Sequence, residues 1–317
     1  MSAAHACLDL DDADGLIAAD RDGLLRAAAM AGAQVRATAA AVEEGALESV
    51  AGGQRPRTIV WVAGRGAAEA AGAMLTAALG SSAAEPLVQA GGSLPWIGPL
   101  DVVVVAGDDP GDPVLVGAAA TAARRGARLV VAAPYEGPLR EAAAGRAAVL
   151  SPRLWVPDDF ALARYLASGL AVCAAVDAAL PTDLSALADE LDAEALRNSV
   201  GREVFTNPAK ALAERMTGRQ VVLAANCAAT LALARHCGAV LLRVAGQPVA
   251  AVGLPDALVA LRTGLAVGVG DTVDSIFHDE EIDGPRTARP RIIALSLAAE
   301  RQVLAARSEE HTSELQS

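Results

Sequence analysis

Two glycine-containing turns are the first places in this sequence where chemistry is expected. Each follows a short apolar run and precedes a helical pattern. Backbone N–H groups and the helix dipole at such a turn favour an anion such as phosphate. A bare strand-to-helix turn explains the same residues, because position 69 is Glu and not the third glycine of a dinucleotide fingerprint. The candidate ligand-binding residues are Gly64, Arg65, Gly66, Gly107, Asp108, Asp109, Gly111 and Asp112.

A second candidate group surrounds the only lysine, Lys210. Glu203 and Asn207 lie within seven positions of it, and a lysine close to a carboxylate can serve in proton transfer. A structural interpretation is equally available: Asn207 can cap a helix whose first position is Pro208. Glu203 and Lys210 are therefore kept as weak catalytic candidates.

Histidines and cysteines give weaker signals. His236 is expected to end a helix, where its charge would favour the helix dipole. His278 lies in an acidic segment that could hold a cation, although a solvated loop is the favoured interpretation. The cysteines, which are not at metal-ligand spacing and are interpreted as reduced thiols, are Cys7, Cys173, Cys227 and Cys237.

The elements that must position these residues form a βαβ series. Apolar runs at 58–63, 101–106 and 129–133 predict strands covered on both faces, as in a parallel sheet. Between the second and third strands, Asp112 is expected to cap a helix with Pro113 at its first position. Gly126 suits the position just after that helix. Arg124 and Arg125 suit its last turn, because positive charge is favourable at the negative end of the helix dipole.

Helices are expected on both sides of this series. Asp20 is a plausible cap for one helix over residues 21–43, and two further helices are predicted over 158–179 and 182–197. A second α/β unit follows, with a strand at 220–224, a helix at 228–236 and a strand at 239–244. Residues 271–291 are expected to form a loop before a last strand at 291–297.

Composition excludes several classes of protein. Of the 317 residues, 53% are hydrophobic but only 3% are aromatic, which predicts a large aliphatic core. The net charge of −12 argues against nucleic-acid binding, which needs clustered Lys and Arg. No uninterrupted apolar run of 18 residues occurs, so no transmembrane helix is expected, and the N-terminus lacks the order of a signal peptide. We therefore expect a cytoplasmic protein.

The last eleven residues differ from the rest. The segment RSEEHTSELQS reads as the in-frame translation of a widely used sequencing-library adapter, and the composition changes abruptly where it begins. We therefore expect the native sequence to be cut short at Ala306. The predicted organisation is an N-terminal helical arm (1–50), a first parallel-sheet domain (51–155), connecting helices (156–200), a truncated second domain (201–306) and the adapter-derived segment (307–317).

The order of these pieces resembles the sugar isomerase (SIS) domain, and more closely the bifunctional phosphoglucose/phosphomannose isomerase family. The matching segments include TIVWVAGRGAAEAAG, PDDFALARYLASGL and FTNPAKALAERMTGRQVVL. The chain is also similar to the TobH proteins, which are degenerate members of that group. The resemblance covers roughly residues 10–300. It implies an α/β fold of two SIS-like, flavodoxin-like αβα domains with an N-terminal helix, no cofactor and no metal, and often a homodimer.

Set against that family, this chain departs at the positions that would do chemistry. Members hold phosphate with Ser and Thr hydroxyls after the second strand, where this chain has the acidic turn 107–112. The stretch matching the family's catalytic Glu is 245–250, which has no carboxylate, and the stretch matching its His offers only Asp256. Asp256 thus joins Glu203 and Lys210 as a weak catalytic candidate.

The sequence therefore leaves three hypotheses. The chain is an active aldose–ketose isomerase of phosphosugars, a non-catalytic protein that binds a carbohydrate derivative or a partner enzyme, or a purely structural partner of a dimer. The loss of hydroxyls, Glu and His favours binding without catalysis. We expect neither nucleic acid nor membrane as a partner.

Overall fold

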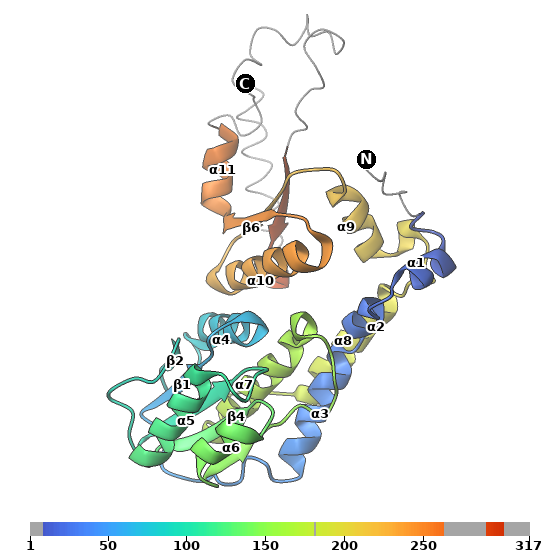
Figure 1. The fold of residues 1–317 in the computed structure, drawn as a ribbon. Helices are drawn as coiled ribbons and strands as arrows, with labels where there is room; N and C mark the ends of the chain where they lie inside the picture. Colours follow the sequence, from blue (N-terminus) through green and yellow to red (C-terminus); the bar gives the residue numbers. More distant parts are fainter. Residues whose placement is uncertain (1–8, 181, 263–289, 301–317) are drawn as a thin grey trace, which may run out of the picture. The chain divides into compact units, whose positions relative to one another are not determined.

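The computed structural model describes residues 9–180, 182–262 and 290–300 (Figure 1). The chain divides into two compact units, Met1–Glu214 and Arg215–Ser317. Each unit is built around a parallel sheet, which confirms the predicted α/β class. The N-terminal arm and the connecting helices belong to the first unit.

The first unit holds a five-stranded sheet and most of the helices. The strands are β1 (Thr58–Val62), β2 (Leu87–Ala90), β3 (Asp101–Ala106), β4 (Arg128–Ala132) and β5 (Ala147–Val149). The helices are α1 (Ala13–Ala19), α2 (Leu24–Ala29), α3 (Ala31–Glu43), α4 (Gly66–Leu79), α5 (Pro113–Arg125), α6 (Gly137–Ala143), α7 (Leu162–Val176), α8 (Leu184–Arg197) and α9 (Pro208–Met216), with the 3-10 turns η1 (Asp158–Phe160) and η2 (Val204–Thr206). All four strand pairs are parallel, in the order β2-β1-β3-β4-β5. This is the flavodoxin-like order, as predicted.

Alternation along the strands divides the core of the first unit into two layers. Ile59, Trp61 and Val104 point to the face that α4 and α7 cover, and Val60 and Val105 point to the face that α5 and α6 cover. The strands β1 and β3 are buried at every position, which explains their continuous apolar runs. Figure 1 shows the sheet between the two helical layers.

Trp61 is the largest side chain in this core, and two glycines make room for it. A Cβ atom on Gly72 would lie 2.3 Å from the Trp61 ring, and one on Gly169 would lie 3.2 Å from it. The indole Nε1–H donates to the carbonyl of Ala68 at 2.9 Å, so the buried polar atom of the ring is satisfied. Packing of α4 and α7 against β1 therefore depends on small residues at two places.

The predicted helix over 21–43 was wrong in its start and its continuity. Asp20 does accept backbone N–H groups, but from Leu24 at 2.7 Å and Leu25 at 2.9 Å, so the helix begins at Leu24. Gly23 precedes it with φ of +68°, a left-handed conformation that helical residues do not adopt. The helix is then interrupted at Met30, which lies between the end of α2 and the start of α3.

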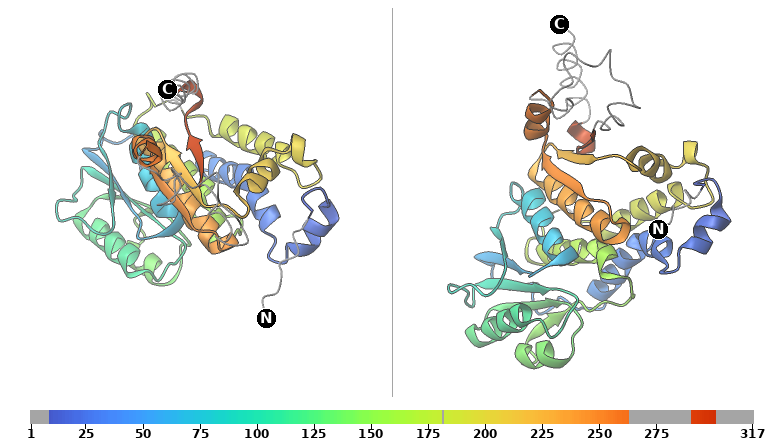
Figure 2. Two further views of the ribbon diagram at one scale, coloured as in Figure 1. Left: turned by 90° about the horizontal axis from the view of Figure 1, so that it is seen from above. Right: turned by 45° about the horizontal axis from the view of Figure 1, so that its top comes forward.

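The second unit holds the three-stranded parallel sheet β7-β6-β8. Its elements are β6 (Val221–Ala225), α10 (Ala228–Ala245), β7 (Val249–Gly253), α11 (Leu254–Arg262), β8 (Arg291–Leu295) and the 3-10 turn η3 (Ala298–Glu300). In Figure 2, α10 lies along this sheet, and its residues Leu231, Ala234 and Leu241 pack against apolar side chains of the three strands. The predicted loop over 271–291 lies mostly outside the described residues.

The predicted strand at 239–244 was wrong, because these residues continue α10 to Ala245. Its apolar face repeats at helical spacing, and the helix ends only at Gly246, with φ of +62°. His236 consequently lies inside the helix and not at its end. In the described part of the chain, α10 is the one helix long and apolar enough to cross a membrane by length and composition, and one of its faces packs against the sheet.

Candidate functional site

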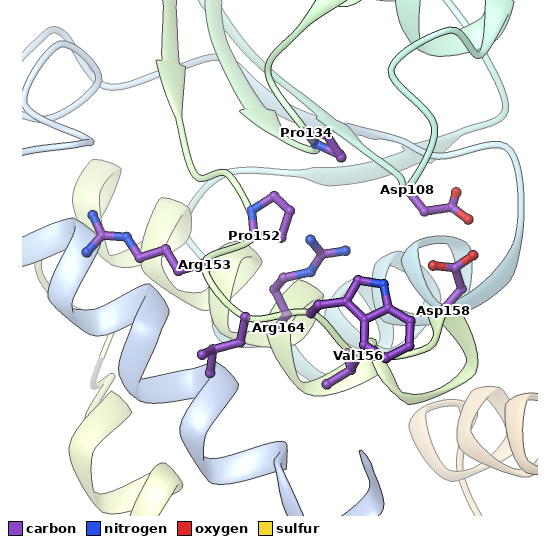
Figure 3. Close-up of a pocket in the computed structure, with 9 residues that line it drawn as sticks. Asp108, Pro134, Pro152, Arg153, Val156, Asp158 and Arg164 are labelled. Atoms are coloured by element: carbon purple, nitrogen blue, oxygen red, sulfur yellow. The ribbon is translucent and has the colours of Figure 1, made fainter. Parts of the chain in front are cut away.

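A cavity of about 420 Å³ opens at the carboxyl edge of the first sheet (Figure 3). Its lining residues Asp108, Pro134 and Pro152 follow β3, β4 and β5, and Asp158 and Arg164 come from η1 and α7. Ligands of open parallel sheets bind at this edge. The volume falls within the roughly 300–1,000 Å³ that small-molecule sites occupy.

Two carboxyl groups face one another in this cavity. Figure 3 shows Asp108 and Asp158 pointing toward each other, close enough for a hydrogen bond between the two carboxyls to influence the pKa of Asp158. That hydrogen bond, followed by burial and the charge of Asp108, raises the pKa of Asp158 to about 6. Like charges at this range cannot both ionise freely, so the pair holds a shared proton in mildly acidic solution.

The pKa of Asp108 moves the other way. Burial pushes it upward, but hydrogen bonds from Asp158 and from the backbone, with the charges of Arg65 and Arg164, outweigh burial and leave the pKa below its ordinary value. Asp108 is therefore the carboxylate of the pair, and Asp158 is the member that carries the proton.

Arg164 supplies the positive charge next to this pair. Its guanidinium donates to the Tyr165 hydroxyl at 2.6 Å and stacks over that ring at 4.4 Å from the centroid. Burial is the main reason that the pKa of Tyr165 rises to about 12, so this hydroxyl stays neutral and adds no negative charge beside Asp108 and Asp158. Two contacts to one side chain thus fix where the arginine points.

A cavity of about 10 Å³ lies behind Arg164, lined by polar side chains that include Gln34, Thr38 and Ser151. Gln34 is 2% exposed, and its Nε2 donates to the carbonyl of Phe160 at 3.1 Å. Within the described residues, Gln34 Oε1 and Arg164 Nε have no partner, one being an acceptor and the other a donor. A space of this size and polarity suits one water molecule, which would further fix Arg164.

The sequence-predicted turns do come together. Because β1 and β3 are neighbours, Arg65 lies near the acidic turn, with its Nη2 atom 3.8 Å from Asp108 Oδ1 and 3.7 Å from Asp109 Oδ2. This edge between β1 and β3 is the point where the strand order reverses. Asp108 belongs both to this meeting point and to the cavity.

Carboxylates of the acidic turn accept hydrogen bonds from backbone N–H groups of the same segment. Asp109 Oδ1 accepts the backbone N–H of Gly111 at 2.7 Å, and Asp112 Oδ1 accepts that of Val114 at 2.8 Å. Asp112 is the predicted cap of α5, followed by Pro113 as expected. Gly107 is required by packing, since a Cβ atom there would lie 2.5 Å from Leu115 Cδ1.

The weak catalytic candidates lie elsewhere. Lys210 is buried on α9, and its ammonium donates to the carbonyls of Val200 at 2.7 Å and Arg202 at 2.8 Å. Asn207 accepts the backbone N–H of Lys210 at 3.0 Å, as the predicted cap would. Glu203 is exposed before η2, and Asp256 is exposed in the first turn of α11, in the second unit. His278 and Cys7 lie outside the described residues.

Sequence reasoning missed most of the cavity. Asp158 and Arg164 lie about fifty positions after Asp108, and only the parallel sheet brings them to one edge. Their neighbourhood did give a signal, because Asp158 and Arg164 both lie in the segment PDDFALARYLASGL, which carries part of the family resemblance. In the described part of the chain, no group of three or more His, Cys, Asp and Glu side chains is placed to hold a metal ion.

Another concavity, of about 860 Å³, lies between α2 and α8. Its lining is mostly apolar, with Leu25, Leu191 and Leu196 among the residues on its walls. Its two carboxylates, Asp192 and Glu194, each pair with an arginine outside its lining, Arg36 and Arg197. Although larger, it is the weaker candidate for recognising a polar small molecule.

Comparison with solved structures points to one class of proteins. A "putative phosphosugar isomerase" from Silicibacter pomeroyi superposes with a TM-score of 0.60 at 14% identity, covering 92% of this chain and 83% of its own. The C-terminal domain of glucosamine-fructose-6-phosphate aminotransferase from Francisella tularensis gives 0.58 at 11%, covering 90% and 79%. Tagatose-6-phosphate ketose/aldose isomerase from Escherichia coli gives 0.53 at 16%, covering 93% and 76%.

The chain shares the fold of phosphosugar isomerases. This confirms the parallel-sheet α/β fold that the resemblance implied, whereas the division into two SIS-like domains stays a prediction, and identities this low show the fold alone. No protein-family model matches the sequence, and no curated protein sequence matches it either. The likeness to TobH proteins and the loss of catalytic residues remain predictions.

Proposed function

We propose that this protein binds a carbohydrate derivative in the carboxyl-edge cavity without acting as an aldose–ketose isomerase. The observation that carries the proposal is the convergence of Asp108, Asp158 and Arg164 on one cavity at the edge where parallel sheets bind ligands. The shared fold with phosphosugar isomerases supports the same ligand class.

The chemistry of the lining suits a sugar. Carboxylate oxygens accept hydrogen bonds from hydroxyl groups, and a guanidinium donates to hydroxyl and ring oxygens. Trp155 also lines the cavity and is 82% exposed, so its ring offers a flat apolar surface for the C–H face of a sugar. Hydroxyl-bearing ligands therefore find both polar and apolar partners.

Turnover is not expected, because two stretches that the resemblance matches to the family's catalytic residues lack them. The stretch 245–250, which the resemblance matched to the catalytic Glu, forms the end of α10, its Gly246 cap and the start of β7, and it carries no carboxylate. The stretch matched to the catalytic His forms the start of α11 and offers Asp256 alone.

Thermal denaturation with a panel of hexoses and hexose phosphates tests the proposal. Ligand at a hundred times its Kd adds about 2.7 kcal/mol to the unfolding free energy, which raises Tm by several degrees. We expect such a rise for at least one sugar, and its loss in Arg164→Gln and Asp158→Asn. Arg197→Gln, which removes a surface arginine paired with Glu194, is the matched control and should keep the rise.

A coupled isomerase assay with glucose 6-phosphate and mannose 6-phosphate completes the test. We expect no turnover above background. Turnover that disappears in Asp158→Asn would replace the binding proposal with an active isomerase, whereas a panel without any rise in Tm would refute carbohydrate binding itself.

A further inference from the structure

The second turn of the first sheet has its anion-binding groups already occupied. In a strand-to-helix turn, a phosphate group would accept the free backbone N–H groups at the helix N-terminus. Here the carboxylates of Asp109 and Asp112 accept the N–H groups of Gly111 and Val114, at 2.7 and 2.8 Å. The N–H group of Val114 belongs to the first turn of α5 and that of Gly111 precedes the helix, so the chain's own carboxylates occupy a donor in each and would repel a phosphate.

The positive charges around the cavity are also compensated. Arg153 lines the cavity but pairs with Glu44 through both terminal nitrogens, and Figure 3 shows it directed away from the carboxyl pair. Arg164 faces Asp108 and Asp158, whose pKa values it lowers. Arg65 lies 3.7 to 3.8 Å from Asp108 and Asp109. These arginines leave little net positive charge for a dianion.

From these two observations we infer that the cavity takes an uncharged carbohydrate and discriminates against its phosphate ester. This inference rests on the proposed function and narrows it. Asp108, Asp158 and Arg164 bind hydroxyl groups. The turn 107–112 does not bind a phosphate, because its own carboxylates already accept its backbone N–H groups. A fold shared with phosphosugar isomerases would then serve an unphosphorylated ligand.

Matched pairs of ligands test the inference. Ligand-observed NMR titrations compare glucose with glucose 6-phosphate and mannose with mannose 6-phosphate, using the full chain. We expect at least one hexose to bind ten times more tightly than its 6-phosphate. In the double variant Asp109→Ser with Asp112→Ser, hydroxyls replace the carboxylates and serine still caps α5. We expect the Kd of the 6-phosphate to fall at least tenfold, with the hexose unchanged.

A charge-matched control separates a local effect from a general one. Asp189 and Asp192 both pair with Arg36 on the surface, and neither lines the cavity. Asp189→Ser with Asp192→Ser changes the net charge by the same amount and should leave both affinities unchanged. Should the serine variant of the turn fold poorly, Asp109→Asn with Asp112→Asn keeps the caps while removing the charges.

The outcomes separate this inference from the proposal beneath it. A wild-type protein that binds the 6-phosphate as tightly as the hexose overturns the inference and leaves carbohydrate binding standing. A turn variant that gains no affinity for phosphate, or a control variant that gains as much, overturns the role of Asp109 and Asp112. Binding of neither ligand in either pair overturns the proposed function and the inference together.

Discussion

The two sheets of this protein begin in the same way and end differently. In each, the first strand lies between the second strand on one side and the third strand on the other, all in parallel. The first sheet adds β4 and β5. The described part of the second has β6 buried between β7 and β8, which are half-buried or exposed along their length. A common order of connections therefore supports two different degrees of burial.

The turns after the first strands differ in chemistry as well. After β1, Gly64 and Gly66 leave the turn without side chains that fill it, apart from Arg65. After β6, Thr230 Oγ1 accepts the N–H of Cys227 at 3.2 Å and contacts Asn226 Oδ1 at 3.2 Å, and Asn226 also donates to Glu300. Side chains close the second turn upon itself. Because the two sheets share one strand order, the residues of each turn, and not the topology, decide whether a ligand can bind there.

The largest effect that would sharpen this comparison concerns Trp61. Replacement by Ala removes a 1% exposed indole from the layer between β1, α4 and α7 and should lower the unfolding free energy by about 3–5 kcal/mol. In β6, Leu223→Ala should cost nearer 2 kcal/mol, because the half-buried strands beside it let the site relax. Urea unfolding with hydrogen exchange in each unit measures both. Equal costs would show that the two cores are packed alike.

The region from β3 to β4 shows how far sequence reasoning reaches. Asp112, Pro113, the arginines of the last turn and Gly126 were each predicted in the positions they occupy around α5. Their signals are local, since a cap or a left-handed glycine depends on a few neighbouring residues. Buried parallel strands add a second local signal, a continuous apolar run.

Errors arose where local signals were ambiguous or distant contacts decided. The apolar run 239–244 is compatible with a buried strand or a buried helix. In the structure it continues α10, whose apolar side chains pack against the second sheet. The cavity was missed for another reason. The facing carboxyls of Asp108 and Asp158 come from residues fifty positions apart, so no spacing within a turn or a helix predicts that they meet.

A smaller effect tests the space around Trp61 directly. Gly169→Ala would place a Cβ atom 2.1 Å from Leu75 Cδ1 and 3.2 Å from the Trp61 ring, so the core must shift. We expect a loss of about 1–3 kcal/mol in unfolding free energy. Gly117→Ala is the control in α5, where a Cβ atom meets nothing within 4 Å. This variant should gain up to about 1 kcal/mol in unfolding free energy from the higher helix propensity of alanine. A loss of stability in Gly117→Ala would mean that the cost of Gly169→Ala reflects a general effect on the helix backbone and not the packing around Trp61.

The smallest effect separates the units by their response to pH. The pKa of Asp158 is raised to about 6, above the value near 3.9 expected in the unfolded chain, so the folded first unit binds this proton more tightly. Its unfolding free energy should therefore fall as pH rises from about 4 to about 6. The lowered pKa of Asp108 acts in the opposite sense and only below about pH 4, where protonation of its carboxylate removes stability.

Asp158→Asn isolates that contribution. Because the amide does not titrate, the fall between pH 4 and pH 6 should flatten in the first unit, and the variant should be more stable than the wild type at pH 7. Amide exchange in β6 and α10 should not respond to the substitution, since Asp158 belongs to the first unit. If Asp158→Asn keeps the wild-type pH dependence of unfolding free energy, the titration belongs to other carboxyls and the cavity does not hold a shared proton. If amide exchange responds equally in both units, the two units unfold as one.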